Sequence, residues 1–79
     1  MDEIFESLTS IAHEVLGTDR DRISYDSLIM EELGADSLDI AEMLAMIEDE
    51  FGIYIPDSLV IEMRTVNDVV KYIYDNTAN

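Results

Sequence analysis

The sequence predicts an all-α fold, a small four-helix bundle with three main helices, one short helix and a long first loop. Apolar residues recur at helical spacing in three separate stretches of the chain. No segment shows the sustained alternation of apolar and polar residues that is typical of strands. With 79 residues and no internal repeat, the chain is expected to form a single domain over residues 1–79.

The first helix is expected over residues 2–16, where apolar residues share one face and acids and serines lie between them. Gly17 follows as a left-handed C-cap. Residues 17–36 are the least regular stretch, and a structureless loop of this length is unusual in a compact domain. Apolar side chains are therefore expected to hold it in place, namely Ile23, Leu28, Ile29 and Leu33. Asp26 is a candidate cap for a turn within it.

The second helix is expected over residues 37–51, and Gly52 ends it. Its apolar stripe consists of Met43, Leu44, Ile47 and Phe51. Pro56 then opens a short helical turn. Thr65 is the expected N-cap of the last helix, and Asp68 three residues later completes an aspartate variant of the capping box. The apolar face of this helix consists of Val66, Val69, Val70, Tyr72 and Ile73.

The charge of the chain limits the kinds of partner it can have. Nineteen acids face four bases, for a net charge of −15. Such a charge repels nucleic acid and anionic membranes and attracts proteins with basic patches. The absence of cysteine excludes disulfides and thiolate metal sites. With no N-terminal signal and no long apolar run, we expect a cytoplasmic monomer that does not insert into membranes.

Neither catalysis nor tight metal binding is favoured by the residue patterns. A nucleophilic serine needs a base, and nothing in the sequence brings the single histidine, His13, to Ser37. The acidic stretch that begins at Asp19 fails the EF-hand pattern, because Ile23 and Ser24 occupy its fifth and sixth positions. We therefore expect no enzyme and no metal site, apart from weak binding of divalent cations to clustered acids.

Ser37 stands in "LGADSLD", at the start of the second predicted helix. Asp36 and Ser37 are adjacent candidates for the N-cap, and only one of them is needed. A hydroxyl at a helix N-terminus is also a favourable place for a phosphodiester, because free N–H groups and the helix dipole attract anions. Gly34 and Ala35 are small and leave a modifying enzyme room to approach. The local sequence alone favours the cap.

Three segments, "LGADSLD", "EDEFGIYIPD" and "TVNDVV", follow one another along the chain, with an acidic amphipathic helix after the first. At this spacing the whole chain resembles the acyl carrier protein family. The resemblance implies that a phosphopantetheinyl transferase uses coenzyme A to attach 4′-phosphopantetheine to Ser37, while Asp36 takes the capping role. The thiol of that group would carry acyl groups as thioesters.

The resemblance also implies two further sets of site residues. Enzymes with basic docking patches would contact an acidic face made of Asp36, Leu38, Asp39, Ala41, Glu42, Ala45, Glu48 and Asp49. The acyl chain would lie between helices, beside Ile29, Ile40, Met43, Leu44, Ile47, Ile55, Val60 and Met63.

The motif "GADSLD" and the acidic helix favour a carrier that shuttles intermediates between the enzymes of fatty acid biosynthesis. Leu59 and Ile61 depart from this pattern, because common fatty-acid carriers often hold acids at those positions. Tyr54 likewise lies in a segment that is usually more polar. These departures support the alternative, a carrier dedicated to a specialised pathway, whether polyketide, peptidyl, aryl or D-alanyl.

Overall fold

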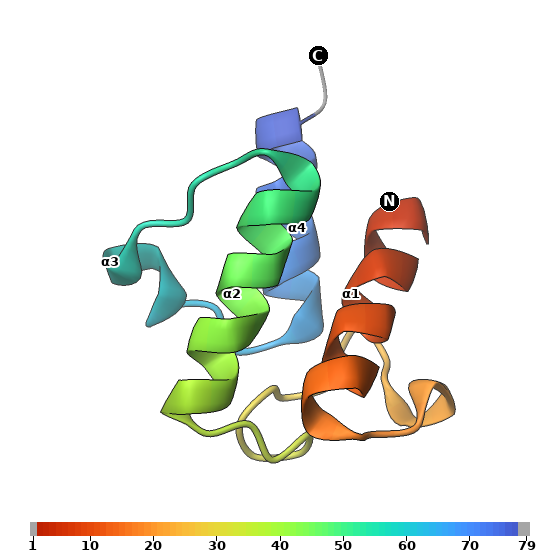
Figure 1. Cartoon of the computed structure of the whole chain (residues 1–79). Coiled ribbons are helices and arrows are strands. Elements are labelled where there is room, and N and C mark those ends of the chain that lie inside the picture. The colour runs from red at the N-terminus through yellow and green to blue at the C-terminus, as the bar shows by residue number, and fades with distance from the viewer. Residues whose placement is uncertain (1, 78–79) are drawn as a thin grey trace.

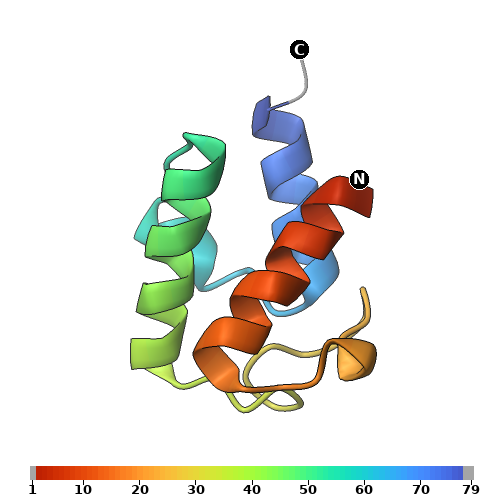
Figure 2. The same ribbon diagram turned by 45° about the vertical axis from the view of Figure 1, so that its right-hand side comes forward.

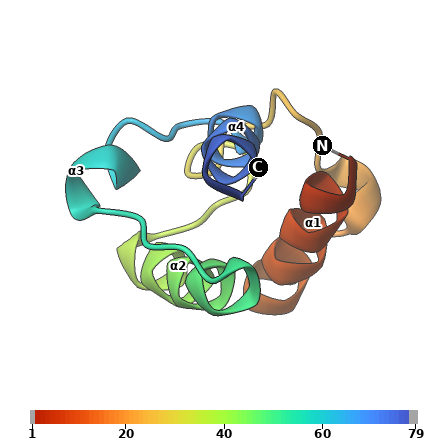
Figure 3. The same ribbon diagram turned by 90° about the horizontal axis from the view of Figure 1, so that it is seen from above.

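Four α-helices and one short 3-10 helix follow one another along residues 2–77, the part of the chain that the computed structural model describes. They are α1 (Asp2–Leu16), η1 (Arg20–Arg22), α2 (Ser37–Phe51), α3 (Asp57–Val60) and α4 (Val66–Thr77). Among the long helices, α1 packs against both α2 and α4. Seen from above, these three surround the centre of the molecule, and α3 lies on the side away from α1 (Figure 1 and Figure 3). The predicted all-α, four-helix architecture is confirmed.

The long helices place three helix ends at one end of the molecule. In Figure 1, α1 runs downward, while α2 and α4 both run upward. Figure 2 shows the same directions with α1 and α2 side by side, and the connection between them crosses the lower end. The start of α2, the start of α4 and the end of α1 therefore lie at the same end, where Ser37 is found.

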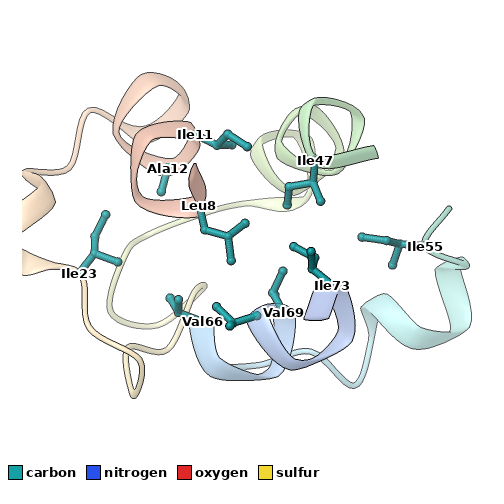
Figure 4. Packing of buried hydrophobic residues seen from close by; sticks show 10 residues of the cluster. Leu8, Ile11, Ala12, Ile23, Ile47, Ile55, Val66, Val69 and Ile73 are labelled. Atoms are coloured by element: carbon teal, nitrogen blue, oxygen red, sulfur yellow. The ribbon is translucent and has the colours of Figure 1, made fainter. Parts of the chain in front are cut away.

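The hydrophobic core is built mainly by α1 and α4. Its buried residues are Leu8, Ile11, Ala12, Ile23, Ile47, Ile55, Val66, Val69, Val70 and Ile73. Figure 4 shows side chains from α1, α2 and α4 directed toward a common centre. Val70 and Ile73 are completely buried, which confirms the predicted apolar face of the last helix. Burial of an aliphatic side chain of this size stabilises the fold by roughly 1.5–3 kcal/mol.

Both predicted glycine C-caps are confirmed. Gly17 has a φ of 72° and donates its N–H to the His13 carbonyl oxygen at 2.9 Å. Gly52 has a φ of 65° and donates to the Glu48 carbonyl oxygen, also at 2.9 Å. A side chain with a Cβ would be strained in this left-handed conformation, so glycine ends both helices at low cost.

Apolar contacts hold the long first connection, as predicted, and η1 lies within it. Ile23 is buried, while Ile29 and Leu33 are partly buried against the core. Leu28 acts differently, because its backbone forms an isolated antiparallel bridge with Thr65. The sequence pattern predicted neither η1 nor this bridge, since neither depends on a period of apolar residues.

Backbone hydrogen bonds attach this connection to the start of α4. The N–H of Val66 donates to the Ser27 carbonyl oxygen at 3.1 Å, and the N–H of Asn67 donates to that of Tyr25 at 2.8 Å. The first N–H groups of a helix have no partner within the helix. Here the connection supplies those partners, so the two segments stabilise each other.

The predicted capping role of Asp26 is wrong. Asp26 is exposed, and the side-chain hydrogen bonds at this turn come from its neighbours. Ser27 Oγ accepts from the Ser24 N–H at 2.9 Å, and the Glu32 carboxylate accepts from the Leu28 N–H at 2.9 Å. The longer glutamate side chain reaches back from one turn later and takes the Leu28 N–H, two residues after Asp26.

Within residues 2–77, no helix is long and apolar enough to cross a bilayer.

The predicted capping box at α4 is confirmed. Asp68 donates its N–H to Thr65 Oγ1 at 3.1 Å, and its carboxylate accepts from the N–H of Thr65 at 3.1 Å and from that of Arg64 at 3.0 Å. The hydrogen bond from the Thr65 N–H is the main cause that lowers the pKa of Asp68 below its ordinary value of 3.8, and partial burial opposes it. The ionised carboxylate is therefore favoured in the folded state.

We predict that Asp68→Ala lowers the free energy of unfolding by about 1 kcal/mol at pH 7, as loss of an N-cap partner does. The folded-state pKa is depressed, so this contribution is present above the unfolded pKa of 3.8 and is lost as the pH falls through the lower folded value. Urea denaturation should thus show that Asp68→Ala and wild type differ less in their free energy of unfolding at pH 3 than at pH 7. Asp75→Ala, at an exposed position of α4, is the control. An equal loss at both pH values would contradict this account.

Candidate functional site

The N-terminus of α2 is capped by Asp36. Its Oδ1 accepts from the Asp39 N–H at 2.8 Å, and Asp39 Oδ2 accepts from the Asp36 N–H at 3.3 Å. This reciprocal pair is a capping box made of two aspartates. Of the two adjacent cap candidates in the sequence, the structure therefore uses Asp36 rather than Ser37.

Ser37 is exposed as the first residue of α2. Its hydroxyl forms no hydrogen bond with any other residue of the described part of the chain. A hydroxyl that neither caps a helix nor bonds to the protein is available to an external reactant. The helix N-terminus beside it also favours an anionic group.

Two further Asp-Ser-Leu tripeptides allow a direct comparison with residues 36–38, and they occupy residues 26–28 and 57–59. Ser27 is only 5% exposed, and its Oγ accepts from the backbone of Ser24. Ser58 is exposed, but it lies in the four-residue helix α3, whose N-cap makes no side-chain hydrogen bond. Identical tripeptides therefore have three different environments, and Ser37 alone follows the capped N-terminus of a long helix.

An apolar groove with a volume of about 590 Å³ runs from Ser37 into the core. Ligand pockets commonly have volumes of about 300–1,000 Å³. Seven of the eight residues expected beside an acyl chain line it, namely Ile29, Ile40, Met43, Leu44, Ile47, Val60 and Met63. They come from the long connection, from α2 and from the α3 region, so the fold brings together residues that are distant in sequence.

Ile55, the eighth residue of that set, does not line the groove. It is only 3% exposed and packs in the hydrophobic core, where its N–H is bonded to Glu48. Its position just before α3 turns the side chain into the core, while α3 itself forms the wall of the groove.

Sequence reasoning missed the wall that α1 and α4 contribute to the groove. This wall and the adjoining loop include Leu8, Ile11, Ala12, Ile23, Val66 and Val69. Helical spacing identifies most of these residues as apolar and inward-facing. It does not show which inward-facing residues meet open space, because that depends on how far the helices stand apart.

Large apolar side chains are exposed around Ser37 and the groove. Met30 and Ile61 both line the groove and are 52% and 82% exposed, respectively. Leu38, next to Ser37, is 71% exposed. Of the departures noted in the sequence, Ile61 thus lies at the edge of the groove, whereas Leu59 and Tyr54 lie outside its lining. Exposed apolar residues gathered in this way are typical of interaction surfaces.

The expected docking face divides into free and structurally engaged acids. Glu42 and Asp49 are exposed, as are Ala41 just before Glu42 and Ala45 between the two acids, and Ala41 also lines the groove. Asp36 and Asp39 hold the capping box. Glu48 is partly buried, and its carboxylate accepts from the Ile55 N–H at 2.8 Å. A docking partner would therefore meet free carboxylates at Glu42 and Asp49, and hydrogen-bonded carboxylates at the other three positions.

Among residues 2–77, no histidine or carboxylate is hydrogen-bonded to the Ser37 hydroxyl as a catalytic base would be. His13 is exposed near the end of α1, and its Nδ1 lies 2.9 Å from the Thr18 carbonyl oxygen, to which it donates in the matching tautomer. The ring is thus bonded to its own helix end rather than to Ser37. In the described part of the chain, no three acidic or histidine side chains are grouped so that they could hold a metal ion.

We predict that Asp36→Ala lowers the free energy of unfolding by about 1 kcal/mol, because it removes the cap of α2. Ser37→Ala should change it by less than about 0.5 kcal/mol, as expected for an exposed residue whose side chain bonds to no other described residue. Urea denaturation of both variants at pH 7 makes the comparison. A larger loss in Ser37→Ala than in Asp36→Ala would mean that Ser37 is the cap.

A comparison with protein families agrees with this geometry. The model of the family described as "Phosphopantetheine attachment site" matches residues 6–73, from α1 through most of α4. Members of this family carry a covalently attached 4′-phosphopantetheine, interact with transferases and other enzymes, and are generally not catalysts themselves. The residues present fit the group, because an unbonded, exposed hydroxyl stands at a helix N-terminus beside an apolar groove. The chain therefore belongs to the phosphopantetheine attachment site family and is a carrier protein that works through this prosthetic group.

Proposed function

We propose that Ser37 bears the 4′-phosphopantetheine and that the chain is a type II-like acyl carrier protein of fatty acid biosynthesis. The observation that carries this proposal is the position of Ser37, which is exposed and part of the lining of the apolar groove, and whose hydroxyl has no hydrogen-bond partner within residues 2–77. Neither Ser27 nor Ser58 combines these properties. The proposal thus rests on the environment of the serine rather than on the tripeptide around it.

Attachment at Ser37 is a phosphoryl transfer from coenzyme A. Ser37 Oγ attacks the phosphorus that carries the pantetheine arm, and a new P–O bond forms. The phosphoanhydride bond breaks, and adenosine bisphosphate leaves with its electron pair. The hydroxyl proton passes to a base of the transferase, because no described side chain is bonded to Ser37 and able to accept it. The N-terminus of α2 favours the phosphodiester that results.

The groove fits a straight aliphatic cargo. When bound, the prosthetic group supplies a terminal thiol that holds acyl groups as thioesters. Most residues that line the groove are aliphatic or methionine, including Met30, Met43 and Met63, and none of the described lining residues is aromatic. Its polar lining residues are Ser37, Glu31, Asp57 and Arg64. Each methylene buried there stabilises the inserted chain by about 0.8 kcal/mol, and methionines adapt to different chain shapes. The extended aliphatic part of this lining favours long fatty acyl chains over aryl and short amino-acyl groups, because only a long chain would cover it.

The exposed face of α2 supports docking of enzymes with basic patches. Glu42 and Asp49 present free carboxylates, and Ala41, Ala45 and Leu38 form small apolar surfaces between and before them. The net charge of −15 speeds the approach of such enzymes, including the phosphopantetheinyl transferase. A carrier that must leave each enzyme quickly benefits from contacts of this kind, which raise the association rate more than the affinity.

We predict that incubation with coenzyme A and a broad-specificity phosphopantetheinyl transferase adds one pantetheine adduct to the wild-type protein and none to Ser37→Ala, measured by intact mass. Ser58→Ala is the matched control, because it alters an exposed serine in an identical tripeptide, and it should be modified like wild type. An adduct on Ser37→Ala, or none on wild type, would show that the attachment site is wrong.

We also predict that the holo protein is loaded with saturated fatty acyl chains by an acyl-transferring enzyme and is not loaded by amino-acid-activating or aryl-activating enzymes. The reason is the aliphatic lining of the groove. Gel mobility and intact mass report loading across such a panel. Efficient loading by an amino-acid-activating enzyme, with none by the acyl-transferring enzyme, would favour a specialised pathway instead.

A further inference from the structure

One peptide group just before α3 is held from two helices at once. Its N–H, on Ile55, donates to Glu48 Oε2 of α2 at 2.8 Å. Its carbonyl, on Tyr54, accepts from the Tyr72 hydroxyl of α4, also at 2.8 Å. Both polar atoms of the Tyr54–Ile55 peptide are therefore bonded to side chains, one on each side. We name this arrangement the peptide clamp.

The peptide clamp matters because α3 has few attachments of its own. This helix has four residues, none of which is fully buried, and its N-cap, Pro56, makes no side-chain hydrogen bond. Its Val60 is partly buried against the core. Nevertheless, Asp57 and Val60 of α3, with Ile61 after it, line the groove. The position of this wall of the groove thus depends on the segments that lead into and out of α3. The clamp holds the first of these segments.

Glu48 also lies on the expected docking face, between the exposed acids Glu42 and Asp49. Its carboxylate therefore has two competing partners, the Ile55 N–H within the protein and a cation of a docked enzyme. A guanidinium or ammonium group forms a stronger, charge-assisted hydrogen bond with a carboxylate than a neutral N–H does. An enzyme that binds Glu48 in this way would withdraw it from the peptide clamp.

We propose that Glu48 is a positioning residue that holds the α3 wall of the groove, and that a cationic group docked at Glu48 releases this wall. Docking on α2 and opening of the groove are thereby coupled through a single hydrogen bond. The coupling to an enzyme rests on the proposed carrier function, whereas the clamp itself is a property of the protein alone. The two parts are therefore tested separately, without any loaded cargo.

Native-state hydrogen exchange of the unmodified protein, followed by NMR, tests the clamp. Glu48→Ala should speed exchange of the Ile55 N–H and of the α3 amides by roughly tenfold relative to the Ile73 N–H, because one hydrogen bond is lost. Glu48→Gln should remain close to wild type, since its amide oxygen still accepts the bond. Glu50→Ala is the matched control, because Glu50 is an exposed acid on the same helix. Equal exchange in Glu48→Ala and Glu50→Ala would overturn the clamp.

A hexaarginine peptide at saturating concentration tests the coupling. Exchange of the Ile55 N–H should rise several-fold in wild type and in Glu50→Gln, while that of the Ile73 N–H stays constant. In Glu48→Gln the peptide should have no such effect, because the neutral amide attracts the guanidinium only weakly. No rise in the wild-type protein, or the same rise in Glu48→Gln, would overturn the coupling. Neither result depends on whether Ser37 accepts phosphopantetheine, so failure of the proposed function remains a separate outcome.

Discussion

The attachment of the long first connection to the start of α4 determines where Ser37 lies. Ser27 and Tyr25 supply carbonyl partners for the first N–H groups of α4, and the N–H of Ile29 donates to the Arg64 carbonyl oxygen at 2.9 Å. The Ile29 carbonyl in turn accepts from the N–H of the buried Ala35 at 3.2 Å. Asp36 follows at once and caps α2. A continuous series of backbone hydrogen bonds therefore connects the start of α4 to Asp36, the residue that precedes Ser37.

The acidic side chains of this protein fall into two groups, those bonded to backbone N–H groups and those exposed and free. The net charge does not distinguish these groups. Asp36, Glu32, Glu48 and Asp68 accept backbone N–H groups at turns and helix ends, where ordinary chains often use hydroxyl or amide side chains. Other acids, such as Glu42, are exposed and free to meet a basic partner. Charge reversal at an engaged acid would disturb the fold as well as docking. Reversal at a free acid reports on docking alone.

Much of the fold could be predicted from periodicity and caps, because these signals are local. Gly52 and the pair of Thr65 and Asp68 ended and began helices as predicted. The backbone attachment of the first connection to α4 could not be predicted, because its hydrogen bonds join main-chain atoms and have no side-chain signature. The environments of the three Asp-Ser-Leu tripeptides could not be predicted either. The same three residues lie in a turn with a buried serine, at the start of a long helix and in α3. Ile55 lies in the core rather than in the groove lining, and the sequence does not distinguish these positions because both favour the same apolar residue.

The central claim is that Ser37 holds the prosthetic group at the edge of a groove built for aliphatic chains. Tandem mass spectrometry of the protein purified from its own host tests this claim most directly, because fragmentation identifies both the modified residue and its cargo. The account predicts phosphopantetheine on Ser37, with part of the population bearing saturated acyl chains. Unmodified Ser37, a group attached to Ser58, or a cargo made only of amino-acyl or aryl groups would contradict it.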